Sequence, residues 1–441
     1  MRAIKFLIIL IFLTSCSFDN KSGIWINENE LSSNKEDLFK EFKKISSNRK
    51  IFNKTVPLTS NYNFDTPKIF NNLDWKDTFY SENNNNLNFA YNDQNRIILK
   101  SKKLTRYKIN NYILAKNNNL ILNDQRGNII VYSINENKLI SKFNFYKKKY
   151  KNIKKKLHII IEKNIIYVGD NLGYAYALNI NDNKIIWAKN YKIPFRSNLK
   201  IKKNKIIISD QKNSLIFLDK TNGNLLNIIP TEETIVHNSF VNNLSLNNND
   251  ILFLNSFGSL YSINIDNMKI NWFLNLKQST NLNTTDLFFG NQIVNYKDKI
   301  IVSSNNNTYL INAINGSIIK TYNFSSNLKP IINNNHFLLI TKNNLILAID
   351  LTSNRIIYSY DVTQKVSNFL NSKKKNLIFY EMLLMNNKIS FFMKNSFKIE
   401  FKINGELENI EKLPAKINSL PIVVNKSIMF VDNKNKLVVI N

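Results

Sequence analysis

Short apolar runs alternate with short polar turns along most of the chain. In residues 165–187, IIYVGDNLGYAYALNINDNKIIW, one apolar run ends in a polar turn with a glycine, a second run follows, and a further turn leads to a third. Comparable blocks begin at Leu120, Ile165, Ile206, Ile251, Ile300, Leu338, Ile389 and Ile428. Subtracting successive starting positions gives spacings of 45, 41, 45, 49, 38, 51 and 39 residues. Because similarity at a nearly constant spacing is typical of a copied structural unit, the pattern indicates eight copies.

Each copy predicts three short strands, with a fourth strand before it. In the third copy the expected strands are 198–202, 205–209, 215–219 and 224–229. Strands of this length joined by short turns are typical of an antiparallel meander, and nearly continuous apolar runs indicate sheets covered on both faces. Four-stranded units repeated in this way predict an all-β fold, an eight-bladed β-propeller. A parallel β-helix needs shorter repeats, and a membrane barrel needs clean alternation, so both are weaker alternatives.

The two ends of the repeat region indicate how the ring closes. The eighth copy stops at Asn441, directly after its third strand, so its outermost strand is missing. We expect residues 71–80, NNLDWKDTFY, to supply this strand and to leave no open edge in the ring. Trp75 would then take the place that Trp187 and Trp272 hold in their own blades. The propeller is therefore expected to span residues 71–441 and to be closed by an N-terminal strand.

The N-terminus has the features of an export signal. A basic start followed by an apolar stretch too short to span a bilayer predicts a secretory signal peptide over residues 1–15. The letters LTSC, which end at Cys16, resemble a bacterial lipobox, and this resemblance implies acylation of Cys16. Ser17 follows in place of aspartate, which implies export to the outer membrane. Residues 16–70 are expected to form a lipid anchor and flexible tether, with a short amphipathic helix at about 36–45.

Composition excludes several classes of function. Cys16 is the only cysteine, so once it is acylated no thiol remains for disulfides, thiolate metal sites or a cysteine nucleophile. The formal net charge is +29. An export signal argues against nucleic acid as the partner, and an anionic membrane surface or an acidic protein fits better. The lysine-rich run at 147–156 is interpreted as a solvated loop between strands.

One copy carries a recognisable repeat motif. Asp170, Gly173, the letters YAYALN and Trp187 resemble the PQQ-type propeller repeat, and eight such repeats behind a lipobox resemble the BamB family of β-barrel assembly lipoproteins. The resemblance implies a non-catalytic scaffold without a cofactor, on the periplasmic face of the outer membrane. Its implied partners are the POTRA domains of BamA, other subunits of the β-barrel assembly (BAM) complex, and unfolded outer-membrane protein clients.

The resemblance also implies a contact site. In the family, an arginine flanked by bulky apolar residues on a connection between blades binds the partner. Arg196 matches the arginine here, with Ile193 and Phe195 as its apolar neighbours. The next connection is acidic in the family but has Phe240 and Asn242 in this chain. A guanidinium and an aromatic side chain suit a binding hot spot, although Phe195 packing beneath its own loop is an open alternative.

Two other readings remain open. PQQ-dependent quinoprotein dehydrogenases share the repeat, but they need a calcium ion held by carboxylate and amide oxygens and a catalytic aspartate. The acidic residues here are expected at turns, as at Asp170, Asp210 and Asp350, where they cap strand ends. The histidines, which are His158, His237 and His336, do not have metal-ligand spacing, so no metal site is predicted. The second alternative is an envelope propeller lipoprotein with a different protein or glycan partner.

Overall fold

The chain divides into two compact units, Met1–Arg49 and Lys50–Asn441. This computed structural model describes residues 16–18, 25–27, 51–58, 62–146, 150–233, 240–277, 288–373 and 377–441. In the first unit, β1 (Cys16–Phe18) pairs antiparallel with β2 (Trp25–Asn27). The expected signal peptide, the expected helix at 36–45 and His237 lie outside the described residues.

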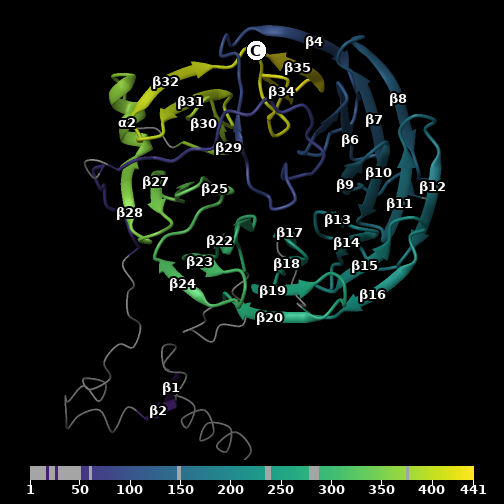
Figure 1. The fold of residues 1–441 in the computed structure, drawn as a ribbon, viewed down its shortest axis with the longest axis horizontal. Coiled ribbons are helices and arrows are strands. Elements are labelled where there is room, and N and C mark those ends of the chain that lie inside the picture. Colours follow the sequence, from purple (N-terminus) through teal and green to yellow (C-terminus); the bar gives the residue numbers. More distant parts are fainter. Residues whose placement is uncertain are drawn as a thin grey trace, which may run out of the picture. The chain divides into compact units, whose positions relative to one another are not determined.

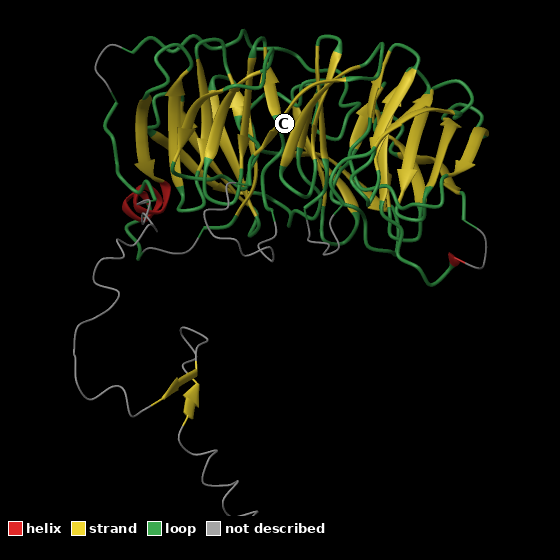
Figure 2. Ribbon diagram, turned by 90° about the horizontal axis from the view of Figure 1, so that it is seen from below, coloured by secondary structure: helices red, strands yellow, loops and turns green. Residues whose placement is uncertain are grey.

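The second unit is an eight-bladed β-propeller, as the sequence predicted, and its blades surround a central axis (Figure 1). Each blade is an antiparallel sheet whose four strands are consecutive in sequence, except that the outermost strand of blade 8 comes from elsewhere in the chain. The side view in Figure 2 shows the strands running between the two faces.

Blades 1 to 3 contain β5 (Leu114–Lys116), β6 (Asn119–Asn123), β7 (Asn128–Ser133) and β8 (Lys138–Asn144); β9 (Leu157–Glu162), β10 (Ile165–Asp170), β11 (Tyr174–Asn179) and β12 (Ile185–Asn190); and β13 (Lys200–Lys202), β14 (Lys205–Ser209), β15 (Leu215–Asp219) and β16 (Leu225–Ile229). Blades 4 to 6 contain β17 (Asn243–Asn247), β18 (Asp250–Leu254), β19 (Ser259–Asn264) and β20 (Ile270–Asn275); β21 (Val294–Tyr296), β22 (Lys299–Ser303), β23 (Thr308–Asn312) and β24 (Ile318–Tyr322); and β25 (Ile331–Ile332), β26 (His336–Ile340), β27 (Leu345–Asp350) and β28 (Ile356–Asp361). Blades 7 and 8 contain β29 (Phe379–Met385), β30 (Lys388–Met393), β31 (Phe397–Lys402) and β32 (Leu407–Lys412); and β33 (Ile422–Val424), β34 (Ser427–Val431), β35 (Lys436–Ile440) and β4 (Ile97–Lys103).

The ring is closed by an N-terminal strand, but the strand is not the expected one. The fourth strand of blade 8 is β4, which pairs antiparallel with β35 in a register that places Leu99 opposite Val439. The prediction that residues 71–80 close the ring is therefore wrong. That segment contains a turn in which the backbone N–H of Tyr80 donates to the carbonyl of Asp77 at 3.0 Å. A turn of this kind prevents an uninterrupted edge strand, whereas β4 is seven residues long.

Trp75 consequently does not take the place of the blade tryptophans. It forms a bridge with Ala115 in β5 and is buried against Tyr80 and Phe89. Trp187, on an outer strand, instead reaches the next blade, where its indole Nε1 donates to the carbonyl of Lys220 at 3.0 Å.

Glycine permits this contact between neighbouring blades. Gly223 has φ +70°, and a Cβ atom added there would lie 2.4 Å from the indole ring of Trp187. Trp272 and Gly316 repeat the arrangement, with the Trp272 indole donating to the carbonyl of Ala313 at 3.1 Å. The tryptophan of the repeat motif therefore joins a blade to its successor.

Turn residues stabilise the strand ends as the sequence predicted. The Asp170 Oδ1 atom accepts hydrogen bonds from the backbone N–H groups of Leu172 and Tyr174, both at 2.8 Å. Asp210 caps the equivalent turn of blade 3, and Asp350 accepts from the N–H of Thr352 at 2.9 Å. These carboxylates are used in folding because each satisfies backbone donors at the end of a strand.

Two further elements cover the ring at blades 6 and 7. The helix α2 (Val362–Phe369) begins at Asp361, whose side chain accepts from the N–H of Gln364. It packs against β28 and β32. Residues 51–58 and 62–70, which the sequence placed in the tether, belong to the propeller unit and contact it at blade 6. The short strand β3 (Asn88–Phe89) pairs in parallel with the inner strand β29.

Candidate functional site at the propeller axis

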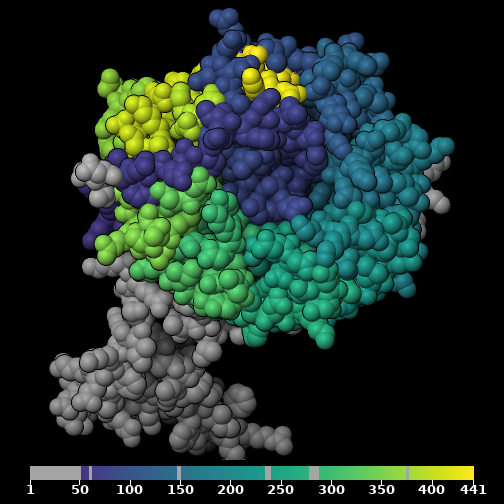
Figure 3. Space-filling view, viewed as in Figure 1, coloured from purple at the N-terminus to yellow at the C-terminus, as the bar shows by residue number. Residues whose placement is uncertain are grey.

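The centre of the ring is filled by the chain itself. Residues 70–91, which we call the axial segment, cross the middle of the propeller, where their purple atoms occupy the centre of Figure 3. The carbonyl of Lys76 accepts from the N–H of Ile161 in β9 at 3.0 Å, and the carbonyl of Glu82 accepts from Leu246 in β17 at 2.8 Å. Inner strands have a row of backbone groups facing the axis, and the axial segment satisfies part of it.

Consecutive asparagines continue this pairing through their side chains. The buried Asn84 Nδ2 donates to the carbonyl of Leu244 in β17 at 3.0 Å. Asn85 makes two bonds with Ile332 in β25, donating to its carbonyl at 2.7 Å and accepting from its N–H at 2.9 Å. Further bonds reach the remaining inner strands, from Trp75 to β5, Asp77 to β13, Asn83 to β21, Asn86 to β29 and Asn72 to β33. The axial segment therefore contacts the inner strand of every blade.

Buried lysines hold this segment in place. Lys200 of β13 is 1% exposed, and its Nζ lies 2.7 Å from the carboxylate of Asp77 and 2.8 Å from the carbonyl of Ser81. Lys329 donates to the carbonyl of Phe79 at 3.0 Å. Burial lowers the pKa of Lys329 to about 8, and burial raises the pKa of the neighbouring Glu381 above its ordinary value.

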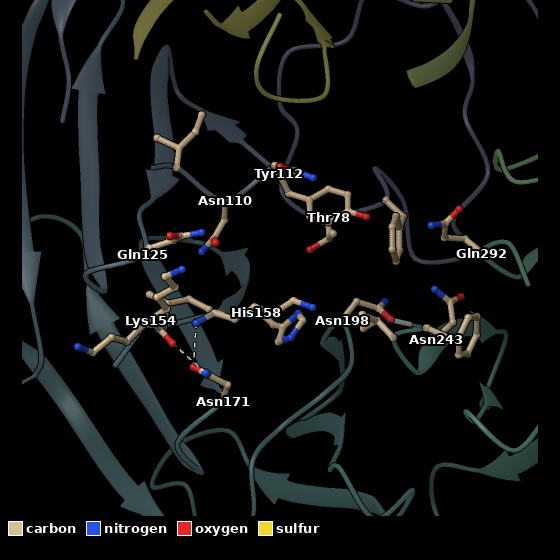
Figure 4. A pocket seen from close by; sticks show the side chains of 18 of the residues that line it. Thr78, Asn110, Tyr112, Gln125, Lys154, His158, Asn171, Asn198, Asn243 and Gln292 are labelled. Carbon is tan, nitrogen blue, oxygen red and sulfur yellow. Dashed lines mark hydrogen bonds between the residues drawn. The ribbon is translucent and has the colours of Figure 1, made fainter. Parts of the chain in front are cut away.

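A cavity of about 670 Å³ lies beside the axial segment, on the face formed by the connections between blades. Thr78 and Phe79 of the axial segment line it, and Figure 4 shows Thr78, His158, Asn198 and Asn243 arranged around the space. Its titratable lining residues are Lys108, Lys154, Lys155, Lys156, His158 and Tyr112. No carboxylate is among the described residues that line it, so the cavity is cationic and suits an acidic group.

His158, a partly exposed residue, lines this cavity beside buried polar residues such as Asn198 and Asn243. Burial lowers the pKa of its imidazole to about 3, and the nearby Lys156 adds to the effect, so the ring is neutral. Its Nε2 atom is buried without a hydrogen-bond partner among the described residues. Burial and the neighbouring Arg196 in turn lower the pKa of Lys156. Arg196 therefore lies close enough to the cationic cavity to act electrostatically on its lining.

The structure brings the two predicted contact loops together but buries most of their side chains. Arg196 donates from its guanidinium to the carbonyl of Phe240 at 2.7 Å, and a bridge joins Ser197 to Asn242. Phe195 is 2% exposed and packs against Tyr191.

The roles expected for three of these residues need correction. Asn242 is fully buried and donates to Ser209 Oγ at 2.9 Å, and Phe195 packs beneath its loop, so neither side chain is available to a partner. Phe240 packs edge-to-face on Phe288 and lines the cavity rather than the outer surface. Ile193 and Arg196 remain partly exposed. The connection between blades 2 and 3 therefore presents two charges, the exposed Lys192 and the partly exposed Arg196.

The sequence reasoning missed the axial segment. Its letters SENNNNLNFA, residues 81–90, are polar and do not alternate, and the repeat pattern begins only after them. Four consecutive asparagines between two aromatic residues were the available signal, since asparagine side chains both donate and accept hydrogen bonds.

The residues at the axis do not fit a calcium-bound quinone. That group needs carboxylate oxygens for the metal and an aspartate base, whereas the described cavity lining is lysine, histidine and amide. Asp77, which lies nearby, is bound to Lys200. Across the described part of the chain, no three His, Cys, Asp or Glu side chains gather in a way that suits a metal ion.

Fold and axis together define an eight-bladed propeller of PQQ-type repeats that encloses a segment of its own chain. Residues 125–360, more than half of the sequence, match the profile of the family described as outer membrane protein assembly factor BamB. The chain belongs to this family.

Solved structures share the fold at low sequence identity. BamB from Moraxella catarrhalis has a TM-score of 0.61 and 10% identity, and the match covers 78% of this chain and 100% of that one. The quinohemoprotein alcohol dehydrogenase ADHIIG from Pseudomonas putida HK5 has a TM-score of 0.61 and 8% identity, covering 83% and 80% of the two chains. These similarities show the fold alone. No curated protein matches the sequence. Within the described residues, no helix has the length and apolar character needed to cross a membrane.

Proposed function

We propose that the protein is a non-catalytic scaffold subunit of the outer-membrane β-barrel assembly complex, held at the periplasmic face of the outer membrane by acylated Cys16. Membership of the BamB family supports this proposal. The observation that carries it beyond the family is the axis. If the protein were a quinoprotein dehydrogenase, its axis would have to hold a cofactor and the carboxylate ligands of that cofactor. Here the axis holds residues 70–91 and a lysine-lined cavity.

The proposed partner surface is the face formed by the connections between blades. Arg196 is partly exposed on the connection between blades 2 and 3, and its charge acts on Lys156, which lines the cavity together with Lys154. A cationic cavity lining without described carboxylates favours an acidic partner through charge complementarity, which raises the association rate. We propose that a POTRA domain of BamA presents acidic side chains to this face, with Ile193 as the apolar neighbour of the arginine.

Co-purification tests this role directly. The Arg196→Glu variant replaces a partly exposed cation by an anion next to Lys156, and we expect at least a tenfold loss of BamA recovered with the protein from detergent-solubilised envelope. Arg355→Glu is the matched control, because Arg355 is an exposed arginine on blade 6 and the charge change is the same. Undiminished recovery of BamA with Arg196→Glu, or an equal loss with Arg355→Glu, would contradict the proposed site.

Because quinohemoprotein alcohol dehydrogenases share this fold, the hypothesis of PQQ-dependent dehydrogenase activity is tested by a separate measurement. The purified protein is incubated with PQQ and calcium, and reduction of an electron-accepting dye by primary alcohols is followed. We expect no dye reduction above a control without protein, because the described carboxylates at the axis, Asp77 and Glu381, lie beside Lys200 and Lys329. Sustained reduction that depends on PQQ, calcium and protein together would overturn the non-catalytic proposal.

A further inference from the structure

The outermost strands of six blades combine an open edge with exposed apolar side chains. The strands β4, β8, β12, β16, β20 and β24 are each the last strand of their sheet, and they lie around the periphery of the ring (Figure 1). Five of them carry two large apolar residues and β16 carries three, each between 37% and 65% exposed. These residues, which we call the outer belt, are Ile97, Ile98, Leu139, Ile140, Ile185, Ile186, Leu225, Leu226, Ile228, Ile270, Phe273, Ile318 and Ile319.

In five of the six blades two belt residues occupy matching consecutive positions because the blades share a β-bulge. In blade 4 Asn271 stands at the second of these positions, and Phe273 corresponds to Ile228 of blade 3. In blade 2 the register shifts between Ala177 and Leu178, and Leu178 faces Ile185. In blade 3 the same shift places Leu218 opposite Leu225, and in blade 5 it places Ile311 opposite Ile318. A bulge leaves one extra residue on the outer strand without a partner, so two consecutive apolar side chains, such as Ile185 and Ile186, are exposed there.

Blade 6 shows what covers such an edge. Its outer strand β28 has the same bulge, with Ile349 opposite Ile356. Here Val56, from the chain's own residues 51–58, forms an isolated antiparallel bridge with Ser359 on the open edge. The N–H of Val56 donates to the carbonyl of Ser359 at 2.9 Å, and the N–H of Ser359 donates to the carbonyl of Val56 at 2.9 Å.

This added segment buries the blade 6 counterpart of the belt. Ile357 is 3% exposed, whereas the equivalent Ile186 of blade 2 is 48% exposed. Leu58 also packs on the apolar cluster of blade 6, and its N–H donates to the Tyr360 hydroxyl at 3.0 Å. The protein therefore contains one example of backbone pairing on the outer edge of a blade, the bridge between Val56 and Ser359. No such bridge is present on the other six outer strands among the described residues, although the N–H of Phe52 donates to the carbonyl of Asn323 just beyond β24 at 2.9 Å.

Charge separates the open edges from the covered ones. The six open strands contain no aspartate or glutamate. Their charged residues are Lys100, Lys102, Lys103, Lys138, Lys142, Lys189 and Lys320. The two strands that other elements cover do contain carboxylates, Asp361 in β28 and Glu408 and Glu411 in β32. The open edges are therefore complementary to a segment with apolar and acidic side chains.

We propose that the outer belt binds extended, unfolded polypeptide segments that carry apolar and acidic residues, by strand addition to the open edges. Main-chain hydrogen bonds would provide affinity for any extended chain, and the apolar pairs and lysines would select its side chains. This inference rests on the proposed function in one respect, because unfolded outer-membrane proteins are the occupants that a barrel-assembly scaffold meets. It adds where on the molecule they bind and by which geometry.

Peptide binding tests the proposal with the purified full chain in detergent. The probe is a short fluorescein-labelled peptide that alternates valine with glutamate or threonine, and binding is followed by fluorescence anisotropy. The control peptide has the same side chains but is N-methylated at alternate residues, which removes the backbone donors. We expect the control to bind at least about tenfold more weakly, because strand addition depends on main-chain hydrogen bonds. Equal binding of the two peptides would overturn the proposal.

Variants of the belt locate the site. The triple variant Ile186→Glu, Leu226→Glu and Ile319→Glu changes three of the six open edges and should halve the amount of peptide bound at saturation. Ile314→Glu is the matched control, because Ile314 is 75% exposed in blade 5 but lies outside its strands, and it should leave binding unchanged. An unaltered stoichiometry in the triple variant would place the peptide elsewhere and refute the belt.

The two proposals fail separately. If the peptide binds as expected but BamA is not recovered with the protein, the belt stands and the assignment to barrel assembly falls. If BamA is recovered but the peptide does not bind, the scaffold role stands and the belt falls.

Discussion

The buried ion pair between Asp77 and Lys200 provides the sharpest test that the axial segment is part of the fold. The perturbation is Asp77→Asn, which keeps a side-chain oxygen for the N–H of Phe79 and removes the negative charge beside Lys200. Lys200 is 1% exposed, so in this variant its ammonium group loses a charged hydrogen bond without gaining water. Breaking a buried pair by removing one partner costs about 3–5 kcal/mol of unfolding free energy.

The expected cost lies at the lower end of that range. Burial already lowers the pKa of Lys200 more than Asp77 raises it, so the lysine can lose its proton in response. We expect Asp77→Asn to cost about 3 kcal/mol. Lys200→Met alone should cost less, because Asp77 still accepts from Phe79. The double variant should lose about 1–2 kcal/mol less unfolding free energy than the two single variants added together, because neither charge is then left unpaired.

Urea unfolding followed by tryptophan fluorescence measures the four proteins of this cycle, and Trp75 within the axial segment reports on the relevant region. A loss of less than about 1 kcal/mol for Asp77→Asn, or a coupling energy near zero, would refute the reasoning that the segment is held by a buried ion pair.

Four other outcomes are expected. Replacing Cys16 by serine should abolish incorporation of labelled fatty acid and move the protein from the membrane to the soluble fraction. Leu99→Pro should lower the melting temperature far more than Leu99→Ala, because proline interrupts the pairing of β4 that closes the ring. Trp187→Ala should cost about 3 kcal/mol, since it leaves a cavity over the glycine of the next blade. Burial lowers the pKa of His336 to about 4, so between pH 6.5 and 4 its imidazole is neutral in the folded protein and charged in the unfolded one. The free energy of unfolding should therefore fall by up to about 3 kcal/mol as the pH is lowered through this window, and by less in His336→Gln.

The repeat architecture could be predicted because its signals are local. An apolar run, a capping residue such as Asp170 and a short turn recur in each copy, and each acts on its nearest neighbours in sequence. The strands expected for the third copy agree with β13 to β16 within two residues at each end. Ring closure was predicted correctly as a topological need, since an eighth blade lacking a strand must find one elsewhere.

The identity of the closing strand could not be read from local pattern. Trp75 suggested a blade motif, but a tryptophan joins two blades only where a glycine such as Gly223 lies beneath it in the next blade. The closing strand β4 reads IILKSKK and resembles an exposed basic segment. The two paired strands, β4 and β35, are separated by most of the sequence, and no residue next to β4 in the sequence indicates this pairing.

The contact site illustrates the same limit. Arg196 was identified from the sequence, and it is accessible. Whether Phe195 and Asn242 face a partner or the core depends on how two connections pack on each other, through the bridge between Ser197 and Asn242. Such packing is set by distant residues, so a motif transferred by sequence position does not tell which of its side chains are buried. That this loop binds a partner stays a prediction.

Filling the axis with protein has a consequence for how this propeller can act. Asp77 is paired with Lys200, which faces the centre, and Asp170 and Asp210 cap turns. These three carboxylates are therefore used within the fold. The described cavity lining and the six open outer strands are both free of acidic side chains. Lysines therefore stand at both proposed surfaces without a carboxylate in the same lining or strand, and both proposed interactions should weaken together as salt is raised. An interaction with either BamA or an extended peptide that is insensitive to salt would mean that apolar contact alone carries it, and that the charge serves another purpose.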